Sequence, residues 1–315
     1  MRLPTSTDLY AWAWRIAPRL PEWPAQAAGA VAADVTWLLH TDGVKQLERN
    51  LARIRPGLSA RELRRLSRAG MRSYMRYFVE AFQVAGFSRE KVLARVRPTG
   101  VPAVAEVLTR GDSVVMALGH SGNWDLAGAW AAYDLGPVLT VAEKLPDGLY
   151  EQFVAFRNSL GIEIVPLEDG NTFRTLLRRA GERPQVVPLL SDRDLTRHGV
   201  EVQIAGLPAR VAAGPAALSL ATGFPLVPVD VHYERLRGEQ RRAAGSRWGL
   251  VIRLLPAIAT HDESGQRRGV QEITQDWVDV LMAAYAQHPQ DWHMLQKVFH
   301  ADLDMERLAR SHGEG

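Results

Sequence analysis

The sequence predicts an α/β fold in which a mixed central sheet is flanked by helices and preceded by a helical N-terminal region. From about residue 113, short apolar runs such as "VVMAL" and "VVPLL" alternate with longer helical patterns, which is typical of strands covered on both faces. Residues 1–100 are strongly basic and carry helical patterns. We therefore expect a helical, basic region over 1–100 that packs on an α/β core over 101–315, the two forming one domain.

The composition fits a globular protein and excludes several kinds of site. Apolar residues make up 46% of the 315 residues and charged residues 23%, which is ordinary for a folded chain. There is no cysteine, so a disulfide framework, a thiolate metal site and a cysteine nucleophile are excluded. No secretory signal is predicted. The uncharged stretch 211–229 contains Gly and Pro at five positions, which favours a short helix, a turn and a buried strand over a membrane span.

The N-terminal region differs in charge from the rest of the chain. Residues 1–100 hold 17 Lys and Arg against 8 Asp and Glu, whereas the remainder has a net charge of −6. This asymmetry favours a polyanionic partner, either nucleic acid or an anionic membrane. Tryptophan prefers the membrane–water boundary, but the same residues could pack a helical hairpin onto the core. Four of the nine tryptophans lie in this region: Trp12, Trp14, Trp23 and Trp37.

A basic stripe is predicted on the helix that follows. Ser59 with Glu62 three residues later forms a capping box. Five arginines at steps of three and four then share one face, with apolar residues opposite. Such a row is usually a solvated face, but only Glu62 and Glu80 supply acid nearby, which favours contact with an anionic membrane. The stripe consists of Arg61, Arg65, Arg68, Arg72 and Arg76.

The core elements are predicted from periodicity and turn signals. The strand candidates are Ser113–Leu118, Val138–Ala142, Ile162–Pro166, Gln185–Leu190, Val200–Ile204, Leu226–His232 and Gly249–Leu255. The helix candidates are Trp124–Asp134, Leu149–Leu160, Thr172–Gly181, Pro215–Thr222 and Val270–Gln287.

The stretch "LGHSGNWDLAG" at 118–128 is the main candidate for chemistry. A serine nucleophile would need G-x-S-x-G, but with Ser121 central, position 123 is Asn rather than Gly. A zinc site would need several ligands at defined spacing. His120 has no second histidine three or four residues away, and His288 and His293 are five apart, so no metal site is predicted.

The remaining interpretation of this stretch is a catalytic His–Asp pair. "ALGH" ends a strand, and Asn123 is a plausible N-cap for the helix that follows. His120 would lie at the carboxyl edge of the sheet, where ligands bind, and Asp125 in the first turn of the helix. Asp125 would fix the imidazole tautomer, and His120 would take a proton from a hydroxyl. The alternative is purely structural: a histidine at a strand end, and an Asp bonded to first-turn amides.

Several blocks together resemble a known family. "HSGNWD" at 120–125 resembles the signature of the H-x4-D glycerolipid acyltransferase superfamily, in its branch of lauroyl- and lipid A-type acyltransferases. Further blocks are most similar to actinobacterial phosphatidylinositol mannoside acyltransferases, and they occur in the family's order over roughly residues 113–300. These are "TVAEKL" at 140–145, "FRNSLGIEIVPL" at 156–167, "LLSDRDLTRHGVEV" at 189–202 and "HPQDWHMLQ" at 288–296.

The resemblance implies a peripheral enzyme at the cytoplasmic face of the inner membrane. It would transfer a fatty acyl chain from acyl-CoA to a mannose hydroxyl of a phosphatidylinositol mannoside, without metal or other cofactor. The implied partners are acyl-CoA, the glycolipid and an anionic membrane surface, and not nucleic acid. His120 would be the base and Asp125 its partner, with Arg157 and Asp192 at the acceptor end. Further substrate-binding candidates are Asn123, Trp124 and Arg193.

The implied mechanism is direct attack without an acyl-enzyme, because no nucleophile is placed for one. Backbone amides around Gly122–Trp124 would stabilise the oxyanion. Arg157 would position the acceptor's phosphate or organise Asp192, a position that is often Glu in relatives. Two alternatives stay open: another glycolipid acceptor, such as a lipid A precursor, and a basic membrane-binding protein without enzymatic activity.

Overall fold

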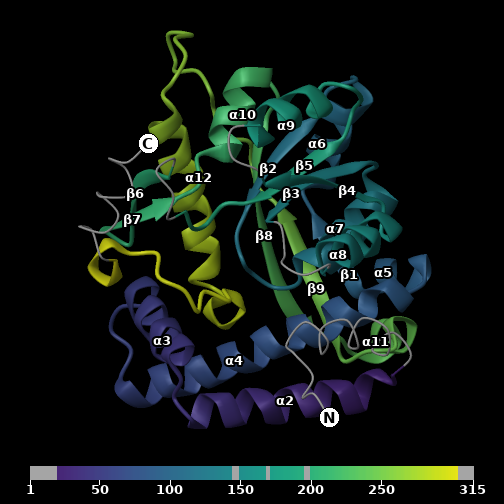
Figure 1. Ribbon diagram of the computed structural model, residues 1–315, viewed down its shortest axis with the longest axis vertical. Helices are drawn as coiled ribbons and strands as arrows, with labels where there is room; N and C mark the ends of the chain where they lie inside the picture. The colour runs from purple at the N-terminus through teal and green to yellow at the C-terminus, as the bar shows by residue number, and fades with distance from the viewer. Residues whose placement is uncertain (1–19, 144–148, 168–170, 195–198, 304–315) are drawn as a thin grey trace.

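The fold is built on a mixed sheet, as predicted. The computed structural model describes residues 20–143, 149–167, 171–194 and 199–303 (Figure 1). Within these residues, seven strands form the sheet, and every neighbouring pair is parallel except β8 with β9. In spatial order the strands are β1 (Val96–Thr99), β9 (Trp248–Leu254), β8 (Leu226–Arg235), β2 (Val114–Leu118), β5 (Val186–Leu190), β3 (Val138–Glu143) and β4 (Ile162–Leu167).

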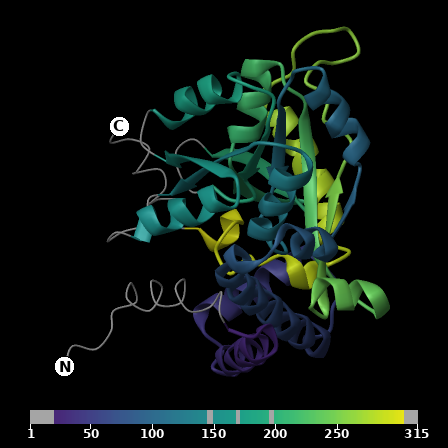
Figure 2. The ribbon, with the colours of Figure 1, turned by 90° about the vertical axis from the view of Figure 1, so that its right-hand side faces the viewer.

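Helices cover both faces of the sheet (Figures 1 and 2). Successive strand residues point to opposite faces, so Val115 joins one apolar core and its neighbours Val114 and Met116 the other. The face of Val115 packs against α9 (Thr172–Ala180), α10 (Gly214–Thr222) and α12 (Val270–Tyr285). The opposite face packs against α5 (Arg89–Arg95), α6 (Val101–Thr109), α7 (Trp124–Asp134) and α8 (Leu149–Ser159).

The N-terminal helices form a layer across one end of the core (Figure 1). They are α2 (Glu22–Leu38), α3 (Asp42–Ile54) and α4 (Ala60–Gln83). α4 begins with the predicted capping box: the Glu62 N–H donates to Ser59 Oγ at 3.3 Å, and the Ser59 N–H donates to Glu62 Oε2 at 2.8 Å. The expectation of a wholly helical region over 1–100 is wrong at its end, since β1 there joins the edge of the sheet beside β9.

The predicted core elements are confirmed, most with end shifts of one to three residues, and α7 and the strand at Val200–Ile204 have the predicted bounds. The predicted strand at Val200–Ile204 is β6, but it pairs with β7 (Leu207–Val211) in a separate two-stranded sheet. The stretch 211–229 contains α10, a turn and the start of β8, as expected. Among the residues that the structure describes, no helix is long and apolar enough to cross a membrane.

Candidate active site

The carboxyl ends of β2 and β5 bring the central residues of the site together. The two strands are parallel neighbours, with Leu118 opposite Leu190. Their pairing continues beyond the strands, since the Ser191 N–H donates to the Leu118 carbonyl at 2.8 Å. His120 and Asp192 each lie two residues past the paired ends. They therefore meet at the carboxyl edge of the sheet, where open α/β sheets bind ligands.

The His120 imidazole is held by the buried carboxylate of Asp192. Nδ1 lies 2.6 Å from Asp192 Oδ1, and the His120 backbone N–H donates to Oδ2 at 2.9 Å. Trp292 Nε1–H donates to the same Oδ2 at 2.8 Å. Burial would raise the pKa of Asp192, but the charge of His120 and these hydrogen bonds outweigh it and lower the pKa. The ionised carboxylate only accepts hydrogen bonds, so Nδ1 carries the proton.

Asp125, which was predicted to orient His120, has different partners. Its Oδ1 accepts from Nε of Arg157 at 2.8 Å and lies 2.8 Å from Nη2 in an ion pair, and its Oδ2 accepts from the Tyr77 hydroxyl at 3.1 Å. The predicted His120–Asp125 contact is therefore wrong, and so is the idea that Arg157 organises Asp192. The physical reason is that β5 presents a carboxylate directly beside the imidazole, while α8 presents a guanidinium to the first turn of α7.

Gly119 allows the carboxylate to approach. A Cβ at this position would lie 2.5 Å from Asp192 Oδ2 and 2.7 Å from the Tyr285 hydroxyl oxygen, both closer than van der Waals contact. Any side chain there would displace the carboxylate from His120. The pKa of Tyr285 is raised by burial and by the charges of Asp192 and Asp230, so this hydroxyl stays protonated beside the site.

Ser121 and Gly122 hold the backbone after His120 in place through hydrogen bonds to carbonyl groups. Ser121 is 2% exposed, and its Oγ donates to the Val231 carbonyl at 2.6 Å, which is incompatible with a nucleophile. Gly122 has φ +59°, and a Cβ there would lie 2.8 Å from the Val231 oxygen. Its N–H donates to the Asp291 carbonyl at 2.9 Å, so this amide, expected to stabilise an oxyanion, is already bonded.

Asn123 is the predicted N-cap, but it lies inside the protein. Its Oδ1 accepts from the Leu126 N–H at 3.0 Å, and its Nδ2 donates to Glu80 Oε2 at 3.0 Å. Glu80 is itself fully buried and ion-paired with Arg95 at 2.5 Å. With both ends of its amide bonded and no exposed surface, Asn123 is placed to hold α7 against α4. The expected contact with substrate does not fit this position.

The Trp124 ring lies between His120, which pairs with Asp192, and Tyr77, which bonds to the Asp125–Arg157 pair. Its ring meets the His120 ring edge-on at 5.5 Å between centroids, and the Tyr77 ring packs on it at 3.8 Å. Trp124 also lines a narrow apolar cavity of about 40 Å³ between α7 and the sheet. The lining consists of Met116, Leu118, Trp124, Ala127, Gly128, Trp130, Ala131, Leu135, Val186, Pro188, Val229, Val231, Ile252 and Leu254.

A series of hydrogen bonds between buried polar residues holds the backbone of His120 in place. The His293 N–H donates to the His120 carbonyl at 2.7 Å. Ser73 of α4 donates to Asp291 Oδ1 at 2.5 Å, so the His293 Nε2–H, 3.0 Å away, donates to Ser73 Oγ. Burial, together with the charges of Arg76 and His120, lowers the pKa of His293 to about 3. His293 is therefore a neutral structural residue.

Arg193 follows Asp192 and is half-buried. No hydrogen bond or ion pair joins its side chain to another residue in the described part of the chain, and its contact with substrate stays a prediction.

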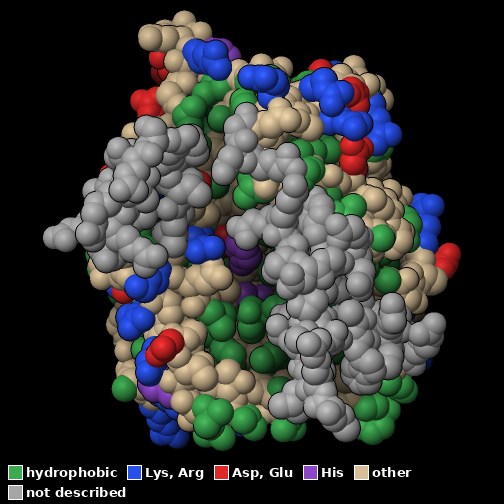
Figure 3. Space-filling model, in the orientation of Figure 1, with side chains coloured by type: hydrophobic (Ala, Val, Ile, Leu, Met, Phe, Trp, Pro, Cys, Tyr) green, Lys and Arg blue, Asp and Glu red, His purple; other side chains and the backbone are tan. Residues whose placement is uncertain are grey.

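Figure 3 shows His and Lys or Arg side chains at the floor of a central hollow, with apolar side chains next to it. No group of three or more His, Asp or Glu in the described ranges is arranged to hold a metal ion.

Three of the five arginines in the predicted stripe on α4 contact other side chains of the protein. Arg68 and Arg72 both bind Asp34 of α2, with Nη2–Oδ2 distances of 2.7 and 2.6 Å. Hydrogen bonds from these two guanidiniums hold the pKa of Asp34 far below its ordinary value. The guanidinium of Arg76 stacks on the Trp248 ring at 3.5 Å. The expectation that only Glu62 and Glu80 supply acid near the row is therefore wrong for Arg68 and Arg72, because Asp34 comes from a neighbouring helix that the helical wheel of α4 cannot show.

The tryptophans of the N-terminal region differ in how far they are buried. Trp37 is partly buried, with Nε1–H donating to Ser67 Oγ at 2.9 Å and the Arg64 guanidinium 4.0 Å above its ring. Trp23 is 74% exposed. Trp12 and Trp14 lie outside the described residues. The hairpin interpretation therefore holds for Trp37, and Trp23 remains a candidate for a surface contact.

Sequence reasoning missed several residues of the site. Trp292, Asp291 and His293 lie in the block "HPQDWHMLQ", whose resemblance to the family carried no role for them. Tyr77 and Ser73 lie on α4, whose sequence pattern is dominated by its arginines and its apolar face. Helical spacing could have found them, since they lie four residues apart and face the core together.

Comparison with known proteins identifies the family. The profile of the family described as bacterial lipid A biosynthesis acyltransferase matches residues 3–301. The chain belongs to this family. The chain is 39% identical over 308 residues to the phosphatidylinositol mannoside acyltransferase of Mycolicibacterium smegmatis (strain ATCC 700084 / mc(2)155). This match covers 96% of the chain and 95% of the relative.

A second relative is similar over the same extent. The phosphatidylinositol mannoside acyltransferase of Mycobacterium tuberculosis (strain CDC 1551 / Oshkosh) is 36% identical over 312 residues, which cover 97% of the chain and 92% of the relative. The resemblance predicted from the motifs is thus confirmed. Membership of the lipid A-type family makes the chain an acyltransferase of lipid biosynthesis.

Proposed function

We propose that the protein is a peripheral membrane enzyme that transfers a fatty acyl chain from acyl-CoA to a mannose hydroxyl of a phosphatidylinositol mannoside. The acceptor is inferred from the names of the relatives, and the chemistry from the site. The observation that carries the chemistry is the His120 ring, 38% exposed at the carboxyl edge of the sheet while its Nδ1 is held by a fully buried carboxylate. That arrangement suits a general base.

The geometry supports direct acyl transfer. With the Nδ1 proton held by Asp192, His120 Nε2 accepts the proton of the mannose hydroxyl. The hydroxyl oxygen forms a bond to the thioester carbonyl carbon, and the carbon–sulfur bond then breaks. The imidazolium returns its proton to the CoA thiolate, and the buried charge of Asp192 stabilises the imidazolium in between. The buried hydroxyl of Ser121 supports a mechanism without an acyl-enzyme.

The surroundings of Trp124 suggest where the substrates bind. The Trp124 ring both contacts His120 and lines the apolar cavity, and the apolar lining of that cavity suits the acyl chain. At about 40 Å³ the cavity admits only a small part of a chain, so binding would have to widen it. The Asp125–Arg157 pair is linked to Trp124 through Tyr77, which donates to Asp125 and packs on the Trp124 ring, and we assign the acceptor to this pair.

We also infer that the enzyme works at the cytoplasmic face of the inner membrane. Its proposed acceptor is a lipid, and its proposed donor is a soluble thioester. Association through a surface, without a spanning helix, would bring both to His120. No metal or other cofactor is needed for the proposed reaction, because the thioester already activates the acyl group.

An acceptor screen tests the proposal. Purified protein is incubated with a radiolabelled acyl-CoA and, in separate reactions, with a phosphatidylinositol mannoside, a lipid A precursor or a lysophospholipid. We expect label in the phosphatidylinositol mannoside alone, with release of free CoA, and none with the His120→Ala variant. Transfer to the lipid A precursor instead would overturn the proposed acceptor. Absence of transfer to every acceptor would favour a binding protein without enzymatic activity.

A further inference from the structure

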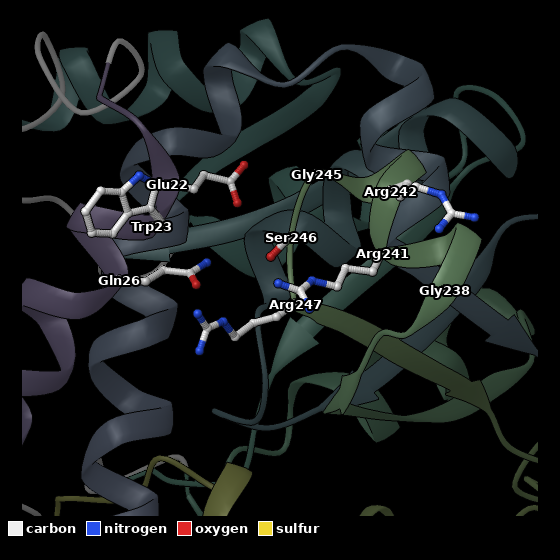
Figure 4. Close-up of a pocket in the computed structure, with 9 residues that line it drawn as sticks. All are labelled: Glu22, Trp23, Gln26, Gly238, Arg241, Arg242, Gly245, Ser246 and Arg247. Atoms are coloured by element: carbon white, nitrogen blue, oxygen red, sulfur yellow. The ribbon is translucent and has the colours of Figure 1, made fainter.

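A cleft lined by arginines lies at the N-terminal end of α2. It has a volume of about 510 Å³ and is bounded by α2, by α11 (Gly238–Ala244) and by the turn that leads into β9. Figure 4 shows the side chains of Arg241 and Arg247 extending toward Trp23 and Gln26 of α2. A second hollow of about 440 Å³ adjoins it and shares Arg241 and Arg247 with it, adding Arg237. We call Arg237, Arg241 and Arg247, together with Trp23 and Gln26, the arginine cleft.

The cations of the arginine cleft lack acidic partners in the described part of the chain. Arg237, Arg241 and Arg247 are exposed, and none has a carboxylate within 4.0 Å among those residues. Glu22 also lines the cleft but pairs with Lys91 and Arg95, and Arg242, a further arginine of the lining, lies 3.9 Å from Glu239. Burial and the neighbouring guanidiniums lower the pKa of the adjacent Arg235, which shows that the cations repel one another. An anion entering the cleft would relieve that repulsion.

Beside the cleft, α2 presents an apolar face outward. A surface helix normally turns its charged residues to water and its apolar residues inward. Here the two acids of α2 point inward: Glu22 binds cations of α5, and Asp34 binds Arg68 and Arg72 of α4. The outward side chains are apolar and between 49% and 74% exposed: Trp23, Val31, Val35, Leu38 and Leu39.

We propose that the arginine cleft binds the phosphate group of an anionic lipid while the outward face of α2 contacts the same bilayer. Charge complementarity supports an anionic occupant, and the apolar face favours a bilayer over nucleic acid or a soluble anion. In Figures 1 and 2, α2 and α11 both lie at the lower end of the molecule. On its other side, α2 packs on α4, which carries Ser73 and Tyr77 of the candidate active site, so the bilayer would lie one helix layer away from that site.

Vesicle co-sedimentation tests this site without any acyl donor, so its outcome is independent of the proposed acyl transfer. The vesicles contain phosphatidylcholine with or without phosphatidylinositol. The test variant is Arg237→Gln/Arg241→Gln/Arg247→Gln. The control, Arg110→Gln/Arg178→Gln/Arg183→Gln, removes the same charge from exposed arginines at the opposite edge of the sheet. Thermal unfolding establishes that both variants fold.

We expect the cleft variant to lose at least about tenfold in affinity for phosphatidylinositol vesicles, and the control much less. Binding of the wild type should weaken as salt is raised, because screening shortens the reach of the arginines. Equal losses in the two variants would overturn the proposal in favour of bulk charge. Undiminished binding by the cleft variant would overturn it outright. Inorganic phosphate should release the wild type more effectively than chloride at equal ionic strength, because phosphate competes with the lipid phosphate for the arginines.

Discussion

Two His–Asp pairs on this sheet are alike in chemistry and differ in surroundings. His120 Nδ1 lies 2.6 Å from Asp192, and His232 Nδ1 lies 2.8 Å from Asp230. Each carboxylate is buried and has a lowered pKa, because its partners outweigh the effect of burial. The His120 side chain is 38% exposed, however, whereas that of His232 is 8% exposed. The His232 ring is stacked on His288 with 3.7 Å between centroids.

The difference shows that a hydrogen-bonded carboxylate alone does not make a catalytic base. His232 lies inside strand β8, where its side chain is buried and stacked on the His288 ring, and Arg253 donates to the same Asp230 oxygen at 2.7 Å. His120 lies two residues beyond the end of β2, where the backbone leaves the sheet and the ring meets solvent. Position relative to the strand end therefore separates the candidate base from the structural pair.

The largest expected effect separates these two histidines. His120→Ala should lower the rate of acyl transfer by about 10⁴-fold without loss of fold, because it removes the base. His232→Ala should instead lower the free energy of unfolding by about 1–3 kcal/mol, because it leaves Asp230 buried with one partner fewer. Steady-state assays and urea denaturation of both variants measure these effects. If a folded His232→Ala protein were as inactive as His120→Ala, His232 would not be a purely structural residue.

The second prediction compares the carboxylates near His120. Asp192→Asn should lower the rate of transfer by about 10²-fold or more, because a neutral amide neither holds the Nδ1 proton nor stabilises the imidazolium. Asp125→Asn should have a smaller effect, felt through Arg157 and mainly in KM for the acceptor. Both rates are measured with saturating donor. The reverse order of severity would return the orienting role to Asp125.

A third prediction extends the comparison to His293, which is buried and uncharged. Its pKa of about 3 lies below its ordinary value of 6.5, so the unfolded state binds more protons between these values. His293 therefore contributes stability above about pH 6.5 that is lost as the pH falls. Between about pH 6.5 and 5 this loss should approach about 2 kcal/mol in the wild type and be absent in His293→Gln. Parallel slopes of unfolding free energy against pH would contradict a neutral His293.

The smallest expected effect concerns Ser121. Ser121→Ala removes a buried hydrogen bond to the Val231 carbonyl, so the free energy of unfolding should fall by about 1 kcal/mol with little change in the rate of transfer. Intact-protein mass spectrometry after mixing with acyl-CoA alone should find no acylated protein. A stable acyl adduct on Ser121 would contradict direct transfer and place a nucleophile beside His120.

Local patterns predicted the elements of the core better than the contacts between them. α7 was predictable because Asn123 caps it and its apolar content is high, and β2 and β5 because their apolar runs end at turn signals. The pairing of β2 with β5 is not encoded locally, so Asp192, 72 residues from His120, could not be recognised as its partner. β1 is an edge strand of four residues that contains Pro98, too short to show alternation.

The N-terminal region shows the same limit. The capping box and the spacing of arginines on α4 were correct, yet the function assigned to the stripe depended on what packs against it. Asp34 binds two of these arginines from α2, 34 and 38 residues away in sequence. The arginine cleft was not predicted at all, because α11, the β9 turn and α2 meet there only in the folded protein.

Nitrogen-15 NMR of the imidazole rings measures whether Asp192 rather than Asp125 orients His120. The His120 resonances are assigned by their absence in His120→Ala, and spectra are recorded where the ring is neutral. The geometry predicts the Nδ1–H tautomer in the wild type and in Asp125→Asn, and its loss in Asp192→Asn. A tautomer that survives Asp192→Asn but is lost in Asp125→Asn would show that Asp125 orients the ring.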